Sequence, residues 1–188
     1  MTRVIQLITC ITQALKATPT GEFDMPKTVT DLNGLQSAVE DFMRALDDCG
    51  DAWAVPIRPG KWTPSQISEH VARSLEESGK DMLGQRSKLP QLPAPVRFLA
   101  RHLGFKRVLK NKAIPAGAKA NRALSPLEGP LTPSAGQDRL RSAWLQFEQA
   151  WDQLDGPARS HLFGTVPAAD YVRFQEIHTR HHQAQLPR

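Results

Sequence analysis

Five apolar residues spaced three or four positions apart constrain the fold of this chain more than any other feature. They are Leu32, Leu35, Val39, Phe42 and Leu46. At 3.6 residues per turn, this spacing places all of them along one side of an α-helix. Gly50 follows as a natural stop. We therefore expect an amphipathic helix that begins near Leu32 and buries one face.

Three later segments show the same helical periodicity. The second helix opens at Thr63, with Pro64 at the first helical position and Gln66 completing a capping box. The third ends before Gly156, and the fourth begins near Pro167. Their apolar faces comprise Ile67, Val71, Leu75 and Met82, then Leu140, Trp144, Phe147, Trp151 and Leu154, then Tyr171, Phe174 and Ile177.

The connection between the second and third helices is long and rich in proline. It covers residues 88–133, and only residues 96–109 within it have a helical pattern. A connection of this length usually crosses the bundle or covers a site. No strand pattern and no internal repeat is evident, so the sequence predicts an all-α four-helix bundle with a crossover between helices two and three.

The N-terminal residues form a separate segment. Val4, Ile8, Ile11 and Leu15 recur at helical spacing, polar residues interrupt the apolar run, and no signal-peptide cleavage site follows. We expect a helical extension over residues 1–27, followed by the bundle domain over residues 28–188. No stretch is apolar enough to span a bilayer, so no membrane partner is expected.

Composition limits the remaining possibilities. A chain of 188 residues with 40% hydrophobic content suits one compact domain. The net charge of +5 would suit nucleic acid, but the densest basic run, at residues 97–112, alternates with apolar residues. A solvated face is favoured there, and no nucleic-acid partner is expected. Cys10 and Cys49 form no metal-binding or redox motif, which favours reduced thiols and a cytoplasmic location.

Three of the six histidines lie within five residues near the end of the chain. His178 and His182 lie one turn apart on the helix face that carries Tyr171 and Phe174, a spacing that can hold one ion. His181 lies about 60° around the helix from His178. Spacing alone does not exclude it as a ligand.

His70 belongs to the inward stripe of the second helix, three residues after Ile67. A buried imidazole without a partner costs about 1–3 kcal/mol, and a metal ion shared with His178 and His182 would satisfy it. Three neutral imidazoles leave a coordination position for water, as catalytic zinc sites do.

Less specific interpretations compete with the metal site. A single histidine on an apolar helix face is more often a hydrogen-bonded core residue, and an isolated HxxxH pair is weak evidence for a metal. Glu69 and Glu176 adjoin the histidines, but both lie off the ligand stripe, and solvated carboxylates are the favoured interpretation. His102 and His161 lie in or near connections and receive no predicted role.

Two stretches resemble the motifs of a known family. KWTPSQISEH and LFGTVPAADYVRFQEIHTRHHQAQL are similar to motifs of the DinB/YfiT-like superfamily of metal-dependent enzymes, over roughly residues 30–186. The resemblance implies an up-down-down-up four-helix bundle. It also implies a divalent metal, most often zinc or nickel, bound by His70, His178 and His182 with water completing the shell. It thus selects His182 over His181.

The resemblance favours a metal more than any one reaction. Some members act on low-molecular-weight thiols, so the expectation is a thiol S-transferase-like enzyme or a hydrolase whose metal activates a thiol or water for a small-molecule substrate. The alternative is a non-catalytic helical module with structural histidines that binds a small molecule or self-associates, and a homodimer suits such a bundle.

Overall fold

The computed structural model describes residues 29–115, 117–118 and 120–187, and it is built around four long helices. These helices are α2 (Val29–Asp47), α3 (Pro64–Met82), α6 (Pro133–Gln153) and α7 (Ala168–Gln183). The predicted all-α four-helix bundle is confirmed. The helical extension expected over residues 1–27 lies outside the described residues, and the division into an extension and a bundle domain stays a prediction.

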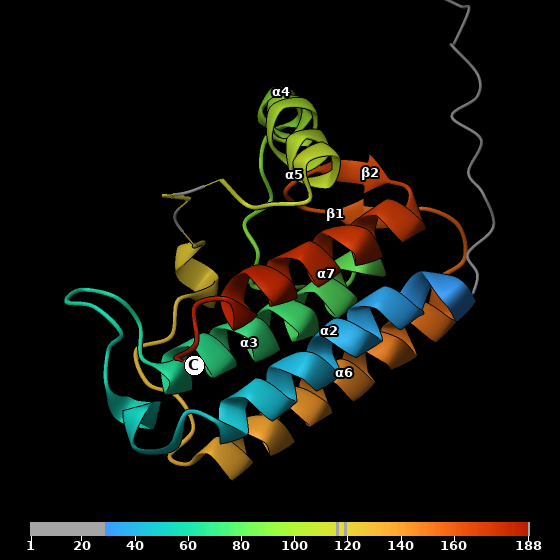
Figure 1. Cartoon of the computed structure of the whole chain (residues 1–188). Helices are drawn as coiled ribbons and strands as arrows, with labels where there is room; N and C mark the ends of the chain where they lie inside the picture. Colours follow the sequence, from blue (N-terminus) through green and yellow to red (C-terminus); the bar gives the residue numbers. More distant parts are fainter. Residues whose placement is uncertain (1–28, 116, 119, 188) are drawn as a thin grey trace, which may run out of the picture.

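The four helices pack in two pairs, α3 with α6 and α2 with α7. Followed by colour in Figure 1, α3 and α6 run in one direction along the bundle and α2 and α7 run in the other. The path is therefore up-down-down-up. Because α3 and α6 are parallel, the chain between them must return along the whole length of the bundle, which is why the crossover is long.

The helix starts follow from local side-chain chemistry. At α3, the Gln66 backbone N–H donates to the Thr63 hydroxyl at 3.1 Å, and the Thr63 N–H donates to Gln66 Oε1 at 3.0 Å. This reciprocal pair is the predicted capping box. At α6, Thr132 accepts from the Ala135 N–H, and Pro133 takes the first helical position.

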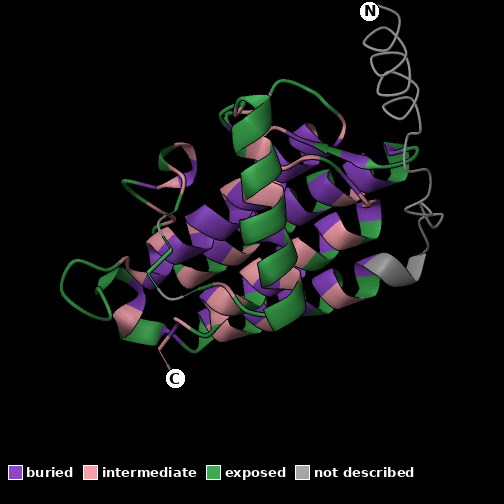
Figure 2. Ribbon diagram, turned by 90° about the horizontal axis from the view of Figure 1, so that it is seen from above, coloured by how far each residue is buried: buried purple, intermediate pink, exposed green. Residues whose placement is uncertain are grey.

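The crossover contains its own helical segment. It is formed by α4 (Ala94–Leu99), a π-helical stretch (Ala100–Phe105) and α5 (Lys106–Asn111), close to the predicted residues 96–109. Buried Phe105 and Val108 anchor it to the bundle beside α7. Most of its other side chains are exposed, including Phe98 and Leu103 (Figure 2). A short 3-10 turn, Arg122–Leu124, follows before α6.

A small hairpin between α6 and α7 was not expected from the sequence. Strands β1 (Ala158–Ser160) and β2 (Gly164–Val166) pair antiparallel, with Ala158 opposite Val166. The expectation of no strand is therefore wrong at this point. Strands of three residues are too short to show an alternating pattern. Gly164 has a φ of +75°, which a residue with a side chain rarely adopts.

The core lies between the four long helices and contains most residues of the predicted apolar stripes, whereas Phe174 is only partly buried and packs against it. Its fully buried side chains include Leu35, Phe42, Leu75, Leu140, Phe147 and Tyr171. Another 3-10 turn, Gly50–Ala54, adds buried Trp53. Cys49 is buried next to it, and burial raises the pKa of its thiol to about 11. Within the described ranges, no helix combines the length and hydropathy that crossing a membrane requires.

Candidate metal centre

Three histidines from two helices point their Nε2 atoms at one place. His70 comes from α3, and His178 and His182 come from α7. The Nε2 atom of His178 lies 3.2 Å from that of His70 and 3.2 Å from that of His182. Candidate ligand atoms of all three lie within 4.8 Å of one another. The three residues predicted from the sequence are thus brought together.

The spacing of these nitrogen atoms suits a metal ion. Zinc binds imidazole nitrogen at about 2.0–2.1 Å, so two ligands of a tetrahedral ion lie about 3.3 Å apart. Both Nε2 separations at His178 are close to that value. The donor set therefore fits a divalent metal ion, because imidazole is a suitable ligand for zinc, copper, iron and nickel alike.

The other ring nitrogen of each histidine faces an oxygen atom. The Nδ1 of His70 lies 2.9 Å from the Leu124 carbonyl oxygen, and the Nδ1 of His182 lies 2.9 Å from Gln185 Oε1. Carbonyl oxygens only accept, so each of these Nδ1 atoms carries the proton and each Nε2 keeps its lone pair. The His178 Nδ1 lies 3.5 Å from the Ser74 hydroxyl. Such outer contacts orient the imidazoles of metal sites.

Burial keeps the three imidazoles neutral. It lowers the pKa of His70 below the ordinary value of 6.5, and it lowers the pKa of His178 well below that value, with further lowering from the neighbouring histidines. The pKa of His182 falls from 6.5 to about 3 for the same reasons. Neutral imidazole is the form that binds metal.

His181 does not belong to the convergent group. Its Nε2 lies 3.0 Å from the side-chain nitrogen of Gln185, and it is not among the residues whose candidate ligand atoms lie within 4.8 Å of one another. It nevertheless lines the adjoining cavity. The geometry therefore agrees with the set that contains His182.

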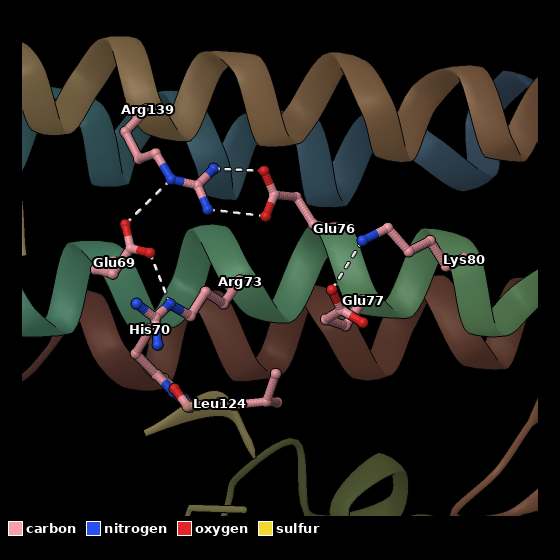
Figure 3. Close-up of polar contacts among 8 residues, drawn as sticks. All are labelled: Glu69, His70, Arg73, Glu76, Glu77, Lys80, Leu124 and Arg139. Carbon is pink, nitrogen blue, oxygen red and sulfur yellow. Dashed lines mark hydrogen bonds and ion pairs between the residues drawn. The ribbon is translucent and has the colours of Figure 1, made fainter. Parts of the chain in front are cut away.

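Glu69 forms a link between helices instead of a contact with the histidines. It accepts from Arg73 at 2.6 Å and from Arg139 of α6 at 3.1 Å, and its side chain is 13% exposed. Arg139 also forms two parallel hydrogen bonds to Glu76, of 2.5 and 2.8 Å (Figure 3). In Figure 3 His70 points away from this network, toward Leu124.

Glu176 is likewise engaged elsewhere. Its side chain is buried and pairs with Arg173 and Arg180 on the same helix. The expectation that Glu69 and Glu176 are solvated is therefore wrong for both residues. Each satisfies arginine side chains in a mostly buried position, where a carboxylate needs a partner.

A cavity of about 970 Å³ adjoins the three histidines. The Pro-rich crossover forms one wall with Leu124, and the loop before α3 forms a second with Trp62. The β1–β2 hairpin forms a third wall with Phe163. The Trp62 ring centroid lies 4.8 Å from that of His70. In the described part of the chain, no aspartate or glutamate lines this cavity.

A buried polar cluster beside the cavity was not predicted. Asp81 of α3 accepts from the backbone N–H of His161 at 3.0 Å and from the Tyr171 hydroxyl at 3.4 Å. The His161 ring nitrogen lies 2.5 Å from the same carboxylate. Burial raises the pKa of Asp81, against the opposing effect of His161. The sequence contains an indication of this cluster, because Ser74, Ser78 and Asp81 continue the helical stripe of His70 and so place polar side chains on the inward face of α3.

Comparison with known proteins places the chain in a family. No match was found among curated proteins or among solved structures. One family model matches residues 32–186. This region includes all three convergent histidines and the four long helices of the bundle, apart from the first turn of α2. The chain belongs to the DinB superfamily.

Proposed function

We propose that this protein is a metal-dependent enzyme in which His70, His178 and His182 bind one divalent ion, zinc or nickel. The observation that carries the proposal is the convergence of three histidine Nε2 atoms beside a cavity of about 970 Å³. A purely structural cluster would not need an adjoining cavity of this size, whereas ligand sites are typically concave and mostly apolar.

The residues of the chain have separate roles in this proposal. The three imidazoles hold the ion, while Leu124 and Gln185 fix the proton on Nδ1 of His70 and His182. Trp62 covers one side of the two rings. A divalent ion bound there supplies Lewis acidity, which lowers the pKa of a coordinated water or thiol. The cavity positions an electrophilic small molecule beside that nucleophile.

The reaction proposed is a thiol S-transfer or a hydrolysis. Both use a nucleophile that is active near neutral pH, and both suit a cavity whose described lining has no carboxylate to compete for the ion. A small-molecule substrate is the partner that the cavity volume suits, and homodimerisation is compatible with the exposed faces of the bundle.

One observation favours a second function. The Nε2 separations of 3.2 Å also suit a hydrogen bond from a protonated His178 Nε2 to one neighbour. The protein would then be a non-catalytic bundle with structural histidines. One N–H donates fully to only one acceptor, so the Nε2 lone pair of either His70 or His182 would remain without a good donor.

Activity after metal replacement separates the two functions. Protein stripped with a chelator is reloaded with zinc or nickel and assayed with a thiol plus an alkylating electrophile, and separately with activated esters. The enzyme proposal expects turnover that depends on added metal and is lost in His182→Ala. Turnover that persists unchanged in a metal-free His182→Ala protein contradicts it.

A further inference from the structure

The segment that follows α3 carries an uneven share of the charge of the chain. Residues 83–127 contain ten of the 24 Lys and Arg residues and none of the 19 Asp and Glu residues. The rest of the chain is net negative, because it holds the other 14 basic residues and all of the acidic ones. Positive charge is therefore concentrated in the crossover, a distribution that favours a negatively charged partner.

The crossover helix, formed by α4, the π-helical stretch and α5 over residues 94–111, exposes an apolar group. Phe98 is 61% exposed, Leu99 54% and Leu103 68%. Phe105 and Val108 are buried, so the helix is held on the bundle by its other face. In Figure 2, which looks down on this helix, most of its visible surface is exposed. Three large apolar side chains within six residues differ from the scattered single ones that ordinary surfaces carry.

A basic group adjoins the apolar group on the same helix. Lys106 and Arg107 follow Leu103 by three and four residues, a spacing that makes side chains neighbours on a helix surface. Lys110 lies three residues further on, and all three basic residues are exposed. No ion pair within the described residues includes any of the three. Their charges are therefore available to a partner.

We propose that the crossover helix lies on an anionic lipid surface. The apolar group inserts at the boundary between headgroups and acyl chains, and the basic group contacts the lipid phosphates, as in other interfacial helices that combine Phe and Leu with Lys and Arg. The expectation of no membrane partner rested on the lack of a spanning stretch, and a helix that lies in the interface needs none. The inference does not depend on the histidine site.

The combination of the two groups selects lipid over other partners. The phosphates of a nucleic acid would attract the basic group, but they offer no apolar surface to Leu99 and Leu103. A second copy of this chain would cover the apolar group, but it would bring two acid-free basic segments together. An anionic bilayer satisfies both groups, because apolar side chains insert while Lys and Arg side chains reach the headgroups.

The test measures binding of the full chain to large unilamellar vesicles by flotation. One set consists of phosphatidylcholine alone, and the other contains roughly one-third phosphatidylserine. We expect the affinity for the anionic vesicles to be at least about tenfold higher, because each Lys or Arg near the surface contributes to the attraction. The affinity should fall as salt is added, since salt screens exposed charges.

Two substitutions separate insertion from charge attraction. Leu103→Asn removes one inserted side chain and should weaken binding to the anionic vesicles about tenfold. Leu145→Asn is the matched control, because Leu145 is also exposed but lies on α6. Arg107→Gln should weaken binding about fivefold, whereas Arg141→Gln, again on α6, should keep the affinity of the parent.

Circular dichroism verifies that each variant remains folded. Because Leu103 is exposed, its replacement removes no core contact. Should Leu103→Asn nevertheless lose helicity, Phe98→Asn provides the same test, because Phe98 is also exposed on the crossover helix. It should likewise weaken vesicle binding without changing the far-ultraviolet spectrum.

Several outcomes would overturn the inference. Absent binding, or equal binding to the two kinds of vesicle, excludes an anionic lipid surface. Binding that Leu103→Asn and Phe98→Asn leave unchanged excludes insertion. A dimer in sedimentation that dissociates in Leu103→Asn, without vesicle binding, assigns the apolar group to a second copy. Salt-dependent binding to a DNA duplex, again without vesicle binding, assigns the basic group to nucleic acid.

Discussion

His70 Nε2 lies 3.2 Å from His178 Nε2, although the two residues are 108 positions apart in the chain. They belong to α3 and α7, which the crossover and α6 separate in sequence. Their contact therefore exists only when the bundle is formed. A metal ion held there binds the folded protein and has no equivalent site in the unfolded chain, so its binding free energy adds to the stability of the fold.

Replacing Gln185 with leucine should weaken metal binding without removing a ligand. The Gln185 carbonyl accepts from His182 Nδ1 at 2.9 Å and so fixes which ring nitrogen faces the site. Losing such a contact typically costs about ten- to a hundredfold in metal affinity. Competition with a chromophoric chelator measures the change. Gln183→Leu, two residues away, should leave the affinity unaltered, and equal affinities in both variants would contradict the role of Gln185.

The metal-free protein should lose stability in mild acid because of the buried imidazoles. The pKa of His182 is about 3 in the folded protein and about 6.5 when unfolded, so the folded state binds fewer protons between these values. The free energy of unfolding therefore falls as pH drops below 6.5. When the pH falls from 6 to 5, we expect the free energy of unfolding, measured by urea denaturation, to decrease by about 1 kcal/mol more in the parent than in His182→Gln.

The control for this pH experiment is His102→Gln, because His102 is exposed on the crossover helix. This substitution leaves the His182 imidazole in place, so the additional loss of stability between pH 6 and 5 should remain. A parent and a His182→Gln variant that lose stability in parallel would show that His182 is not held neutral by burial.

Arg139 should stabilise the bundle independently of the metal. Its guanidinium bridges α6 to α3 through two bonds to Glu76 and one to Glu69. Lysine cannot reproduce this planar double contact. We expect Arg139→Lys to lower the free energy of unfolding by about 1–2 kcal/mol with unchanged metal content.

Arg141→Lys is the matched control, because Arg141 lies on the same helix in an exposed pair with Asp138. It should change stability by less than about 0.5 kcal/mol. Loss of metal in Arg139→Lys would instead link the ion-pair network to the histidine site.

The bundle was predictable because each long helix repeats its apolar stripe over several turns. The stripe from Leu32 to Leu46 is buried as expected, and the capping box at Thr63 marks the start of α3. The β1–β2 hairpin was not predictable, since a strand of three residues has no detectable period. Its place is fixed by tertiary contacts such as that of the His161 backbone with Asp81.

The site was predictable only in part. Helical spacing pairs His178 with His182, and the inward stripe singles out His70, so the convergent residues follow from the sequence. Their outer partners do not. The Leu124 carbonyl oxygen lies against His70 Nδ1 although the two residues are 54 positions apart in the chain. Such contacts depend on how the crossover folds back, which a helical period does not encode.

Metal content tests the central claim most directly. Protein purified without an affinity tag is analysed by elemental mass spectrometry beside a variant with His70, His178 and His182 all changed to alanine. We expect about one zinc or nickel ion per chain in the parent and none in the variant, whose circular dichroism should stay helical. A parent that remains metal-free after incubation with zinc and nickel, or a folded variant that retains the metal, would contradict the account.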